Sequence, residues 1–357
     1  MAEVALLSPD DLAWADALDR VRHDVYHLPE YVRLDARSSG GTPAAVRYDD
    51  GGRVLLLPLL IRPIPDTDLR DAVSPYGYPG PVSNAGRDDL DFWSRAGRAM
   101  ADLLSGQGIV TAFVRLHPLL PAPPAALATA GTVVHHGETV SLDLSLTPEQ
   151  MWSQTHRTHR NQINKARRAG VSIVVDDWDR LDEWIDTYHA NMRRVGATDF
   201  YFFPPEYFHE LRAALGQRVH LAVASAGASA SASASASASA SAVASAGGEV
   251  LGGNLFFEYR GIMHTHLQAT RDGEIHYADK LLYDEIRRWG RDRGNTVYHL
   301  GGGLGGSADS LFRYKAAFGA GRNDFHTWRV VTDPHTFEKL AGPPTPESMS
   351  GRFPPYR

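Results

Sequence analysis

Residues 299–306 read His-Leu-Gly-Gly-Gly-Leu-Gly-Gly, and residues 307–318 continue Ser-Ala-Asp-Ser-Leu-Phe-Arg-Tyr-Lys-Ala-Ala-Phe. The residues before the glycines, Thr296–Leu300, predict a strand, and the residues after them predict a helix capped by Ser307. Five glycines in six positions need unusual backbone angles or the close approach of another group. A strand, a glycine loop and a helix start can together hold an anion, because free backbone N–H groups point outward there.

Lys315 follows Tyr314 in this predicted helix, with Phe312 and Phe318 close by in the sequence. A lysine in aromatic surroundings can stabilise a developing oxyanion or bind a phosphate, and burial would lower its pKa. The loop lacks the register of a P-loop, and its place near the end of the chain does not fit the opening turn of a dinucleotide-binding unit. A tight crossover between packed elements and a solvated lysine are the structural alternatives.

The composition excludes several kinds of site. The chain has no cysteine, which excludes disulfides, thiolate nucleophiles and iron–sulfur clusters and leaves only histidine and carboxylate as metal ligands. His264, His266 and Gln268 alternate along a predicted strand and are expected to share one face. Histidines spaced this way without a carboxylate more often serve packing than zinc binding, so we expect no metal. Serine-hydrolase and zincin motifs are also missing from the sequence.

The charge balance is mildly acidic. Lys and Arg number 36 against 42 Asp and Glu, a net charge of −6, so binding to a polyanion must depend on a local patch and we expect no DNA partner. The amino terminus has acids where a signal peptide needs basic residues, and the most apolar run, Val54–Ile61, is too short to cross a membrane. We therefore expect a cytoplasmic protein without a membrane span.

Gln150–Gly170 forms a basic patch on this acidic chain. The segment is predicted to be helical, contains no acidic residue, and opens with a capping box that pairs Thr147 with Gln150. The basic side chains that helical spacing brings to one side are Arg157, Arg160, Lys165 and Arg168. Two interpretations are open. These side chains bind the phosphate backbone of an RNA, with an affinity that falls steeply as the salt concentration rises, or they form an ordinary solvated helix face.

The predicted elements occur twice in the same order, which suggests a duplicated α/β unit. In residues 1–145 they are the helix Asp10–Asp19, the strands Ala44–Tyr48 and Arg53–Arg62, the helix Leu90–Leu104 and the strand Ile109–Leu116. In residues 146–319 they are the helices Trp178–Arg194 and Glu206–Leu215, strands at 218–224, 249–257 and 261–267, the helix Tyr277–Arg293 and the strand Thr296–Leu300. Residues 225–248 are almost entirely Ser, Ala and Gly and predict a disordered loop.

Four segments of the chain together resemble those of the Fem-type peptidyltransferases, a family within the GNAT acyltransferase superfamily. They are Arg157–Gly170, Met192–Pro204, Tyr207-Phe208 and His299–Lys315. The resemblance implies an α/β (α+β) protein with two tandem GNAT-like domains, mixed sheets flanked by helices, and no coiled-coil arm of the kind some members carry. It also implies that the segment 320–340, with a strand at Phe325–Val331, returns to complete the first domain.

The resemblance implies an activity as well. Fem-type enzymes move an aminoacyl group from aminoacyl-tRNA to an amine of a peptidoglycan precursor or, in antibiotic-pathway relatives, of a peptide-like acceptor, and an amide bond forms. The expected partners are charged tRNA and a small peptide or muropeptide acceptor. We expect no bound cofactor, and a monomer or weak dimer.

The candidate site residues come from the patterns above and from the resemblance. The catalytic candidates are Lys315, Tyr314 and His266. The substrate-binding candidates are Tyr76, Tyr78, Tyr201, Gln268, Gly301, Gly302 and Gly303. The tRNA-binding candidates are Arg157, Arg160, Lys165 and Arg168. The essential lysine of the family falls on Lys315, where the resemblance implies that it stabilises the tRNA end or the tetrahedral oxyanion.

Two other functions are compatible with the sequence. The first is a GNAT N-acetyltransferase that uses acyl-CoA, although Gln268–Glu274 matches the pyrophosphate-binding pattern of such enzymes poorly, with one glycine in the wrong register. The second is a non-catalytic module that binds RNA or a peptide. It would keep the basic helix but tolerate the loss of Lys315.

Overall fold

The computed structural model describes residues 2–226, 248–271 and 277–357. The Ser/Ala loop expected at 225–248 lies almost entirely outside the described residues. The chain divides into two compact units: unit 1 is Met1–Glu138, Gly305–Ser307 and Asn323–Arg357, and unit 2 is Thr139–Leu304 and Ala308–Arg322. In the described part of the chain, no helix is both long enough and apolar enough to cross a membrane.

Unit 1 is built on a mixed sheet with helices on both faces. Its strands, in spatial order, are β1 (Glu3–Leu7), β2 (Thr42–Asp49), β3 (Val54–Pro63), β4 (Arg70–Val73), β6 (Ile109–Arg115), β13 (Gly321–Val331) and β7 (Thr132–Asp143), and β5 (Val82–Ser83) pairs with β3. Its helices are α1 (Leu12–Arg20), α2 (Pro29–Ser39), α3 (Leu90–Gly106), α4 (Pro124–Leu127), α12 (Pro334–Ala341) and α13 (Pro346–Ser350). Strands β4 and β6 are parallel. The antiparallel pairs are β1–β2, β2–β3, β3–β4, β3–β5 and β6–β13.

Strand β3 explains the most apolar run of the sequence. Leu55, Leu57 and Leu59 pack in a core with Phe92 and Trp93 of α3, and the intervening residues of β3 are buried as well. Since successive side chains of a strand point to opposite faces, both faces of this strand are covered. The run Val54–Ile61 is therefore a central strand.

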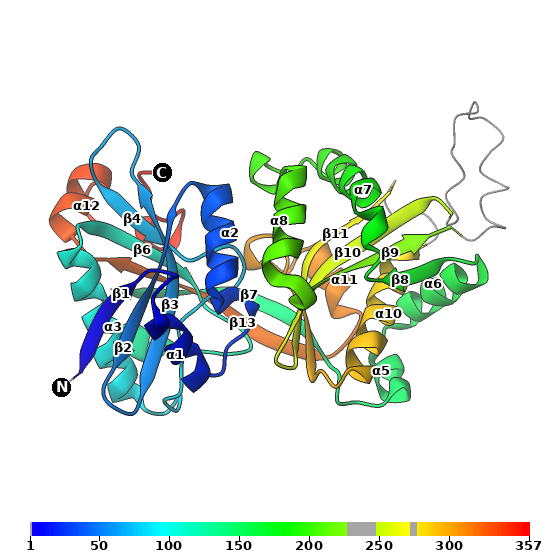
Figure 1. Cartoon of the computed structure of the whole chain (residues 1–357), viewed down its shortest axis with the longest axis horizontal. Coiled ribbons are helices and arrows are strands. Elements are labelled where there is room, and N and C mark those ends of the chain that lie inside the picture. Colours follow the sequence, from blue (N-terminus) through cyan, green and yellow to red (C-terminus); the bar gives the residue numbers. More distant parts are fainter. Residues whose placement is uncertain (1, 227–247, 272–276) are drawn as a thin grey trace. The chain divides into compact units, whose positions relative to one another are not determined.

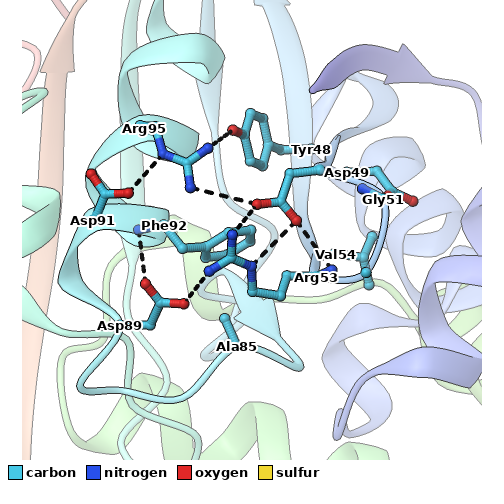
Figure 2. A network of polar contacts seen from close by, with 12 residues as sticks. Tyr48, Asp49, Gly51, Arg53, Val54, Ala85, Asp89, Asp91, Phe92 and Arg95 are labelled. Carbon is cyan, nitrogen blue, oxygen red and sulfur yellow. Dashed lines mark hydrogen bonds and ion pairs between the residues drawn. The ribbon is translucent and has the colours of Figure 1, made fainter. Parts of the chain in front are cut away.

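A network of ion pairs fixes the start of α3 to the β2–β3 hairpin (Figure 2). Arg53, which directly precedes β3, contacts Asp50 in the hairpin turn and Asp89, the N-cap of α3. Arg95 of α3 bonds Asp91 at 3.0 Å and approaches Asp50 at 3.5 Å. The Arg53 guanidinium also lies 5.1 Å from the ring centre of Phe92. Asp89 therefore serves two roles, because it caps the helix through the Phe92 N–H and holds the hairpin.

Unit 2 repeats the arrangement of a mixed sheet between helices. Its strands follow the order β7, β12 (Val297–Gly301), β11 (Ile262–Thr270), β10 (Val250–Tyr259), β9 (Val219–Ser225) and β8 (Ser172–Val175). Its helices are α5 (Pro148–Gln154), α6 (Arg157–Arg168), α7 (Leu181–Arg194), α8 (Pro205–Leu215), α10 (Ala278–Asp292) and α11 (Ser310–Ala316). β11 and β12 are parallel, and the other pairs are antiparallel. Figure 1 shows α7 and α8 on one face and α6 and α10 on the other.

A β-bulge interrupts the pairing of β11 with β10. Leu255 pairs with Leu267 and the next residue, Phe256, pairs with Thr265, so His266 is an extra residue on β11. The bulge reverses the alternation of side chains beyond it. Gln268 pairs with Asn254 and faces the α10 side, where Asn254 contacts Tyr298. The expectation that Gln268 shares a face with His264 and His266 was therefore wrong, because alternation holds only in an uninterrupted ladder.

The mixed α/β class expected from the sequence is confirmed, and most elements lie within a few residues of their predicted bounds. The capping box of Thr147 and Gln150 is present, but the helix predicted from 150 to 170 is divided at Thr155 and His156 into α5 and α6. Asp309, not Ser307, caps α11, because its carboxylate accepts the Phe312 N–H at 2.8 Å. Strand β1 and most of helix α2 were not predicted.

Candidate functional site

Lys315 lies on α11 and is bound to the glycine loop. Its ammonium Nζ donates to the carbonyl oxygen of Gly302 at 2.7 Å. Asp309 fixes the geometry of this turn, since it caps α11 and also accepts the Leu304 N–H at 2.9 Å. Burial lowers the pKa of Lys315 to about 8, against the opposing effect of Asp309. The ammonium has three N–H donors, so two are left for another ligand once Gly302 is bound.

The neighbouring residue Tyr314 is fixed at both its backbone and its ring. Its carbonyl accepts a hydrogen bond from His159 Nε2 at 3.1 Å, and its ring centre lies 5.1 Å from the ammonium of Lys280. Its buried hydroxyl lies next to Asp279 and Gln268. Burial, with the nearby Asp279, raises the pKa of Tyr314 well above its usual value. The hydroxyl of Tyr314 is therefore neutral at physiological pH.

Asp279 and Lys280 form a buried ion pair in the first turn of α10. Their carboxylate and ammonium are 2.9 Å apart, and only 2% of Lys280 is exposed. The negative charge of Asp279 suits a helix N-terminus. The ammonium of Lys280 also lies 5.8 Å from the ring centre of Tyr277. A buried charge is costly without its partner, so these two residues depend on each other.

Helix α6 joins the basic surface to this site. His156 N donates to the carbonyl oxygen of Ala317 at 2.8 Å, and His159 binds Tyr314, so α6 is tied to α11 at two points. Burial and the charge of Lys280 lower the pKa of His159. Since its Nε2 faces a carbonyl, Nε2 carries the proton and Nδ1 carries the lone pair. His159 is thus a neutral donor that links the two helices.

The four basic candidates on α6 remain available to a ligand. Arg157, Lys165 and Arg168 are exposed and Arg160 is half-exposed, and none of the four forms an ion pair with any residue that the structure describes. Arg167 differs, because it bonds Asp284 at 2.6 Å and Glu285 at 2.7 Å. The ammonium of Lys165 lies 5.6 Å from the ring centre of Tyr277, and the ammonium of Lys280 lies 5.8 Å from the same ring centre. The basic face therefore extends to the edge of the Lys315 site.

His266 lies on the other face of the sheet from Tyr314. Its Nε2 is 2.9 Å from the hydroxyl of Tyr207 on α8, and its ring centre is 4.5 Å from that of Phe257. Burial and the neighbouring His264 lower the pKa of His266 to about 3, so its imidazole is neutral at physiological pH. The structure thus brings Lys315, Tyr314 and Gln268 together but turns His266 away from them.

The other substrate-binding candidates lie in three places. Gly301 ends β12 with a left-handed φ of 79°, which favours glycine, and Gly302 and Gly303 follow it. Tyr201 ends a short 3-10 helix, and its carbonyl accepts the hydroxyl of Tyr188 at 2.7 Å. Tyr76 and Tyr78 belong to unit 1. The carbonyl of Tyr76 accepts the hydroxyl of Tyr31 at 2.8 Å, and the ring of Tyr78 packs edge-on against Tyr26.

Unit 1 holds a buried cluster that the sequence analysis missed. The carboxylate of Asp24 contacts His117 Nε2 at 2.7 Å and His27 Nδ1 at 2.9 Å. His117 Nδ1 accepts two backbone N–H groups, those of Leu119 and Leu120, so the proton of His117 lies on Nε2 and points at Asp24. No local pattern marks this cluster, because Asp24 and His117 are far apart in the sequence.

The sequence and the structure were compared with those of known proteins. No protein-family model matches the sequence, and no curated protein matches it. The solved structure of FemX matches with a TM-score of 0.68 at 11% identity, over 91% of this chain and 96% of FemX. The chain has the FemX fold. The fold expected from the resemblance to Fem-type proteins is therefore confirmed.

Two further solved structures have folds similar to that of this chain. One is L-PGS from Bacillus licheniformis, and the other is the C-terminal domain of a protein named as a lysylphosphatidylglycerol synthetase from Agrobacterium fabrum. Each matches with a TM-score of 0.54 at 13% identity, over 90% of this chain and 92% of its own. At 13% identity the similarity shows that the fold is shared.

The buried ion pair gives a prediction about stability. In Lys280→Met, the carboxylate of Asp279 stays buried without its partner, so we expect the free energy of unfolding to fall by about 3–5 kcal/mol. Adding Asp279→Asn to that variant removes the unpaired charge, and we expect part of the loss to be recovered. Urea denaturation followed by circular dichroism measures both changes.

Lys165→Met is the matched control, because Lys165 lies at a similar distance from Tyr277 but is exposed. We expect it to change the free energy of unfolding by less than about 0.5 kcal/mol. If Lys280→Met were as mild as this control, the two buried charges would not depend on each other.

Proposed function

We propose that this protein is an acyltransferase that moves an aminoacyl group from an aminoacyl-tRNA to the amine of a peptide-like acceptor. The observation that carries the proposal is the position of Lys315. Its ammonium is held on Gly302 of the glycine loop, with two N–H donors that bond no other described residue, and Tyr314 and His159 join it to the basic helix α6. The shared FemX fold supports it. Charged tRNA is a cytoplasmic substrate, so the proposal assigns the reaction to the cytoplasm.

The proposed reaction is a direct transfer. The nitrogen of the acceptor amine attacks the ester carbonyl of the aminoacyl-tRNA, and a tetrahedral intermediate with a negative oxygen forms. The new carbon–nitrogen bond is kept, the ester carbon–oxygen bond breaks, and the proton lost by the amine leaves on the terminal hydroxyl of the tRNA. Lys315 offsets the charge of the oxyanion, because a fixed ammonium in half-buried surroundings needs little reorganisation.

The basic face of α6 supplies the donor site in this proposal. Arg157, Arg160, Lys165 and Arg168 bind the phosphates of the tRNA acceptor end, and Lys165 lies closest to the Tyr277 edge of the Lys315 site. Phosphate contacts of this kind position a nucleic acid without reading its sequence. The acceptor is a peptidoglycan precursor or a small peptide, and no bound cofactor takes part.

The donor is tested by comparing two labelled substrates. We expect transfer of radiolabel from a mixture of charged tRNAs, with a UDP-linked muramyl pentapeptide or a pool of short peptides as acceptor. Lys315→Ala should lower the rate about 100-fold or more, as is typical when a donor to an oxyanion is removed. Transfer of label from acetyl-CoA, with none from charged tRNA, would overturn the proposal.

The pKa of Lys315 predicts the pH dependence of the reaction. Since burial lowers this pKa to about 8, the ammonium loses its proton as the pH rises through 8, and we expect kcat to fall there. In Lys315→Arg, the guanidinium stays charged far above this pH, so the fall should move up by more than about two pH units. A fall that stayed at the same pH in the variant would assign it to another group.

The basic helix predicts the salt dependence of tRNA binding. Replacing Arg157, Arg160, Lys165 and Arg168 by Gln should flatten the plot of log affinity against log salt by about 0.7–0.9 for each phosphate that the variant no longer binds. Arg193→Gln with Arg194→Gln, at the exposed end of α7, is the control and should leave the slope unchanged. An unaltered slope in the fourfold variant would show that the basic face of α6 is an ordinary solvated helix face that does not bind tRNA.

A further inference from the structure

A second cluster of chemically active side chains lies in unit 1, on the neighbouring strands β7 and β13. His135 of β7 and His326 of β13 have ring centres 4.9 Å apart. Asp324 lies two residues before His326 on β13, and its carboxylate oxygen Oδ1 is 3.3 Å from His135 Nε2. Residues two apart on a strand share a face, so all three side chains lie on the same side of this pair of strands.

The same residues have the chemistry of a metal site. Two imidazoles and one carboxylate form a donor set that suits Zn²⁺, Ni²⁺ and Cu²⁺. The chain has no cysteine, so no thiolate competes for such an ion.

The side chains must move to bind an ion, because as they lie the three donor atoms do not converge on one point. The His135 side chain is 53% exposed and that of Asp324 is 70% exposed, so both can change rotamer without disturbing a core. The backbone beneath them is held, because the His326 carbonyl accepts the Leu116 N–H at 2.9 Å. The positions are therefore fixed while the ligand atoms are adjustable.

The neighbouring groups do not belong to this cluster. His136 Nε2 contacts the hydroxyl of Thr327 at 2.8 Å, and burial with the charge of Arg329 lowers the pKa of His136. The Arg329 guanidinium donates to the carbonyl oxygens of Met349 and Gly351. The positive charge of Arg329 therefore acts on His136. Beside His135, in contrast, lies the negative charge of Asp324.

We propose that His135, His326 and Asp324 bind one divalent transition-metal ion per chain. The ion would link β7 to β13 within unit 1, and water would complete its coordination. An ion that binds only the folded state stabilises that state, and the gain in the free energy of unfolding grows with the logarithm of the ratio of ion concentration to dissociation constant. The bound ion would therefore raise the Tm. This inference stands independently of the proposed function, because none of the three residues belongs to the Lys315 site.

The test uses the full chain without a polyhistidine tag, after removal of metal with EDTA. Titration with Zn²⁺ and with Ni²⁺ by calorimetry should show one ion per chain, and either ion should raise the Tm. His135→Gln and His326→Gln should each weaken the affinity about 10-fold or more, since each removes a ligand. Asp324→Asn should weaken it less, because the amide oxygen can still coordinate.

His209 supplies the matched control. Its Nε2 is also 3.3 Å from an aspartate, Asp182, and its side chain is 56% exposed, but no second imidazole is recorded beside it among the described residues. His209→Gln should therefore leave the affinity and the Tm shift unchanged. The proposal fails if either ion binds the His135→Gln and His326→Gln variants as tightly as the unaltered chain, or if His209→Gln weakens binding equally.

Discussion

The pairing of β13 with β6 is the constraint on which unit 1 depends. The strand joins β6 through five residue pairs, from Thr327 with Arg115 to Val331 with Thr111, and it is supplied by the part of the chain that follows unit 2. It brings Trp328 into the core against α3. A Cβ on Gly131 would meet the carbonyl of Arg329 at 2.5 Å, so the neighbouring backbone is shaped to this strand. Unit 1 is therefore complete only when β13 returns to it from beyond unit 2.

The candidate site of unit 2 depends on a similar convergence of separate segments. Lys315 comes from α11, Gln268 from β11, His159 from α6 and the ion pair from α10. Tyr314 is the residue that most of them contact, and it precedes Lys315 directly. Because its carbonyl, ring and hydroxyl each have a separate neighbour, a change in any of these elements would move the lysine. The position of Lys315 thus depends on packing several residues away from it.

The sequence predicted the parts of this arrangement that have a local signature. Glycines followed by a Tyr-Lys pair, and a basic run without acids, are visible in one dimension, and the structure joins them through His159 and Tyr314. Asp279 and Lys280 were missed, because charged residues at a helix start are usually solvated. The turn of Gln268 away from His266 was missed because one extra residue in a ladder leaves no trace in an alternating pattern. The return of β13 was expected only from the resemblance to a known family.

The bulge at His266 also bears on how this chain can change through evolution. A deletion of one residue at that point would leave β11 with a regular ladder, and the sheet would still form. Thr265 and Leu267 would then be neighbours opposite Phe256 and Leu255, as a regular ladder requires, so Gln268 would keep its partner Asn254 and its face. The loss of a paired residue of β11, in contrast, would turn the side chains beyond it to the other face. Relatives that use the same site can therefore lack the extra residue between Thr265 and Leu267 and still turn the glutamine toward α10.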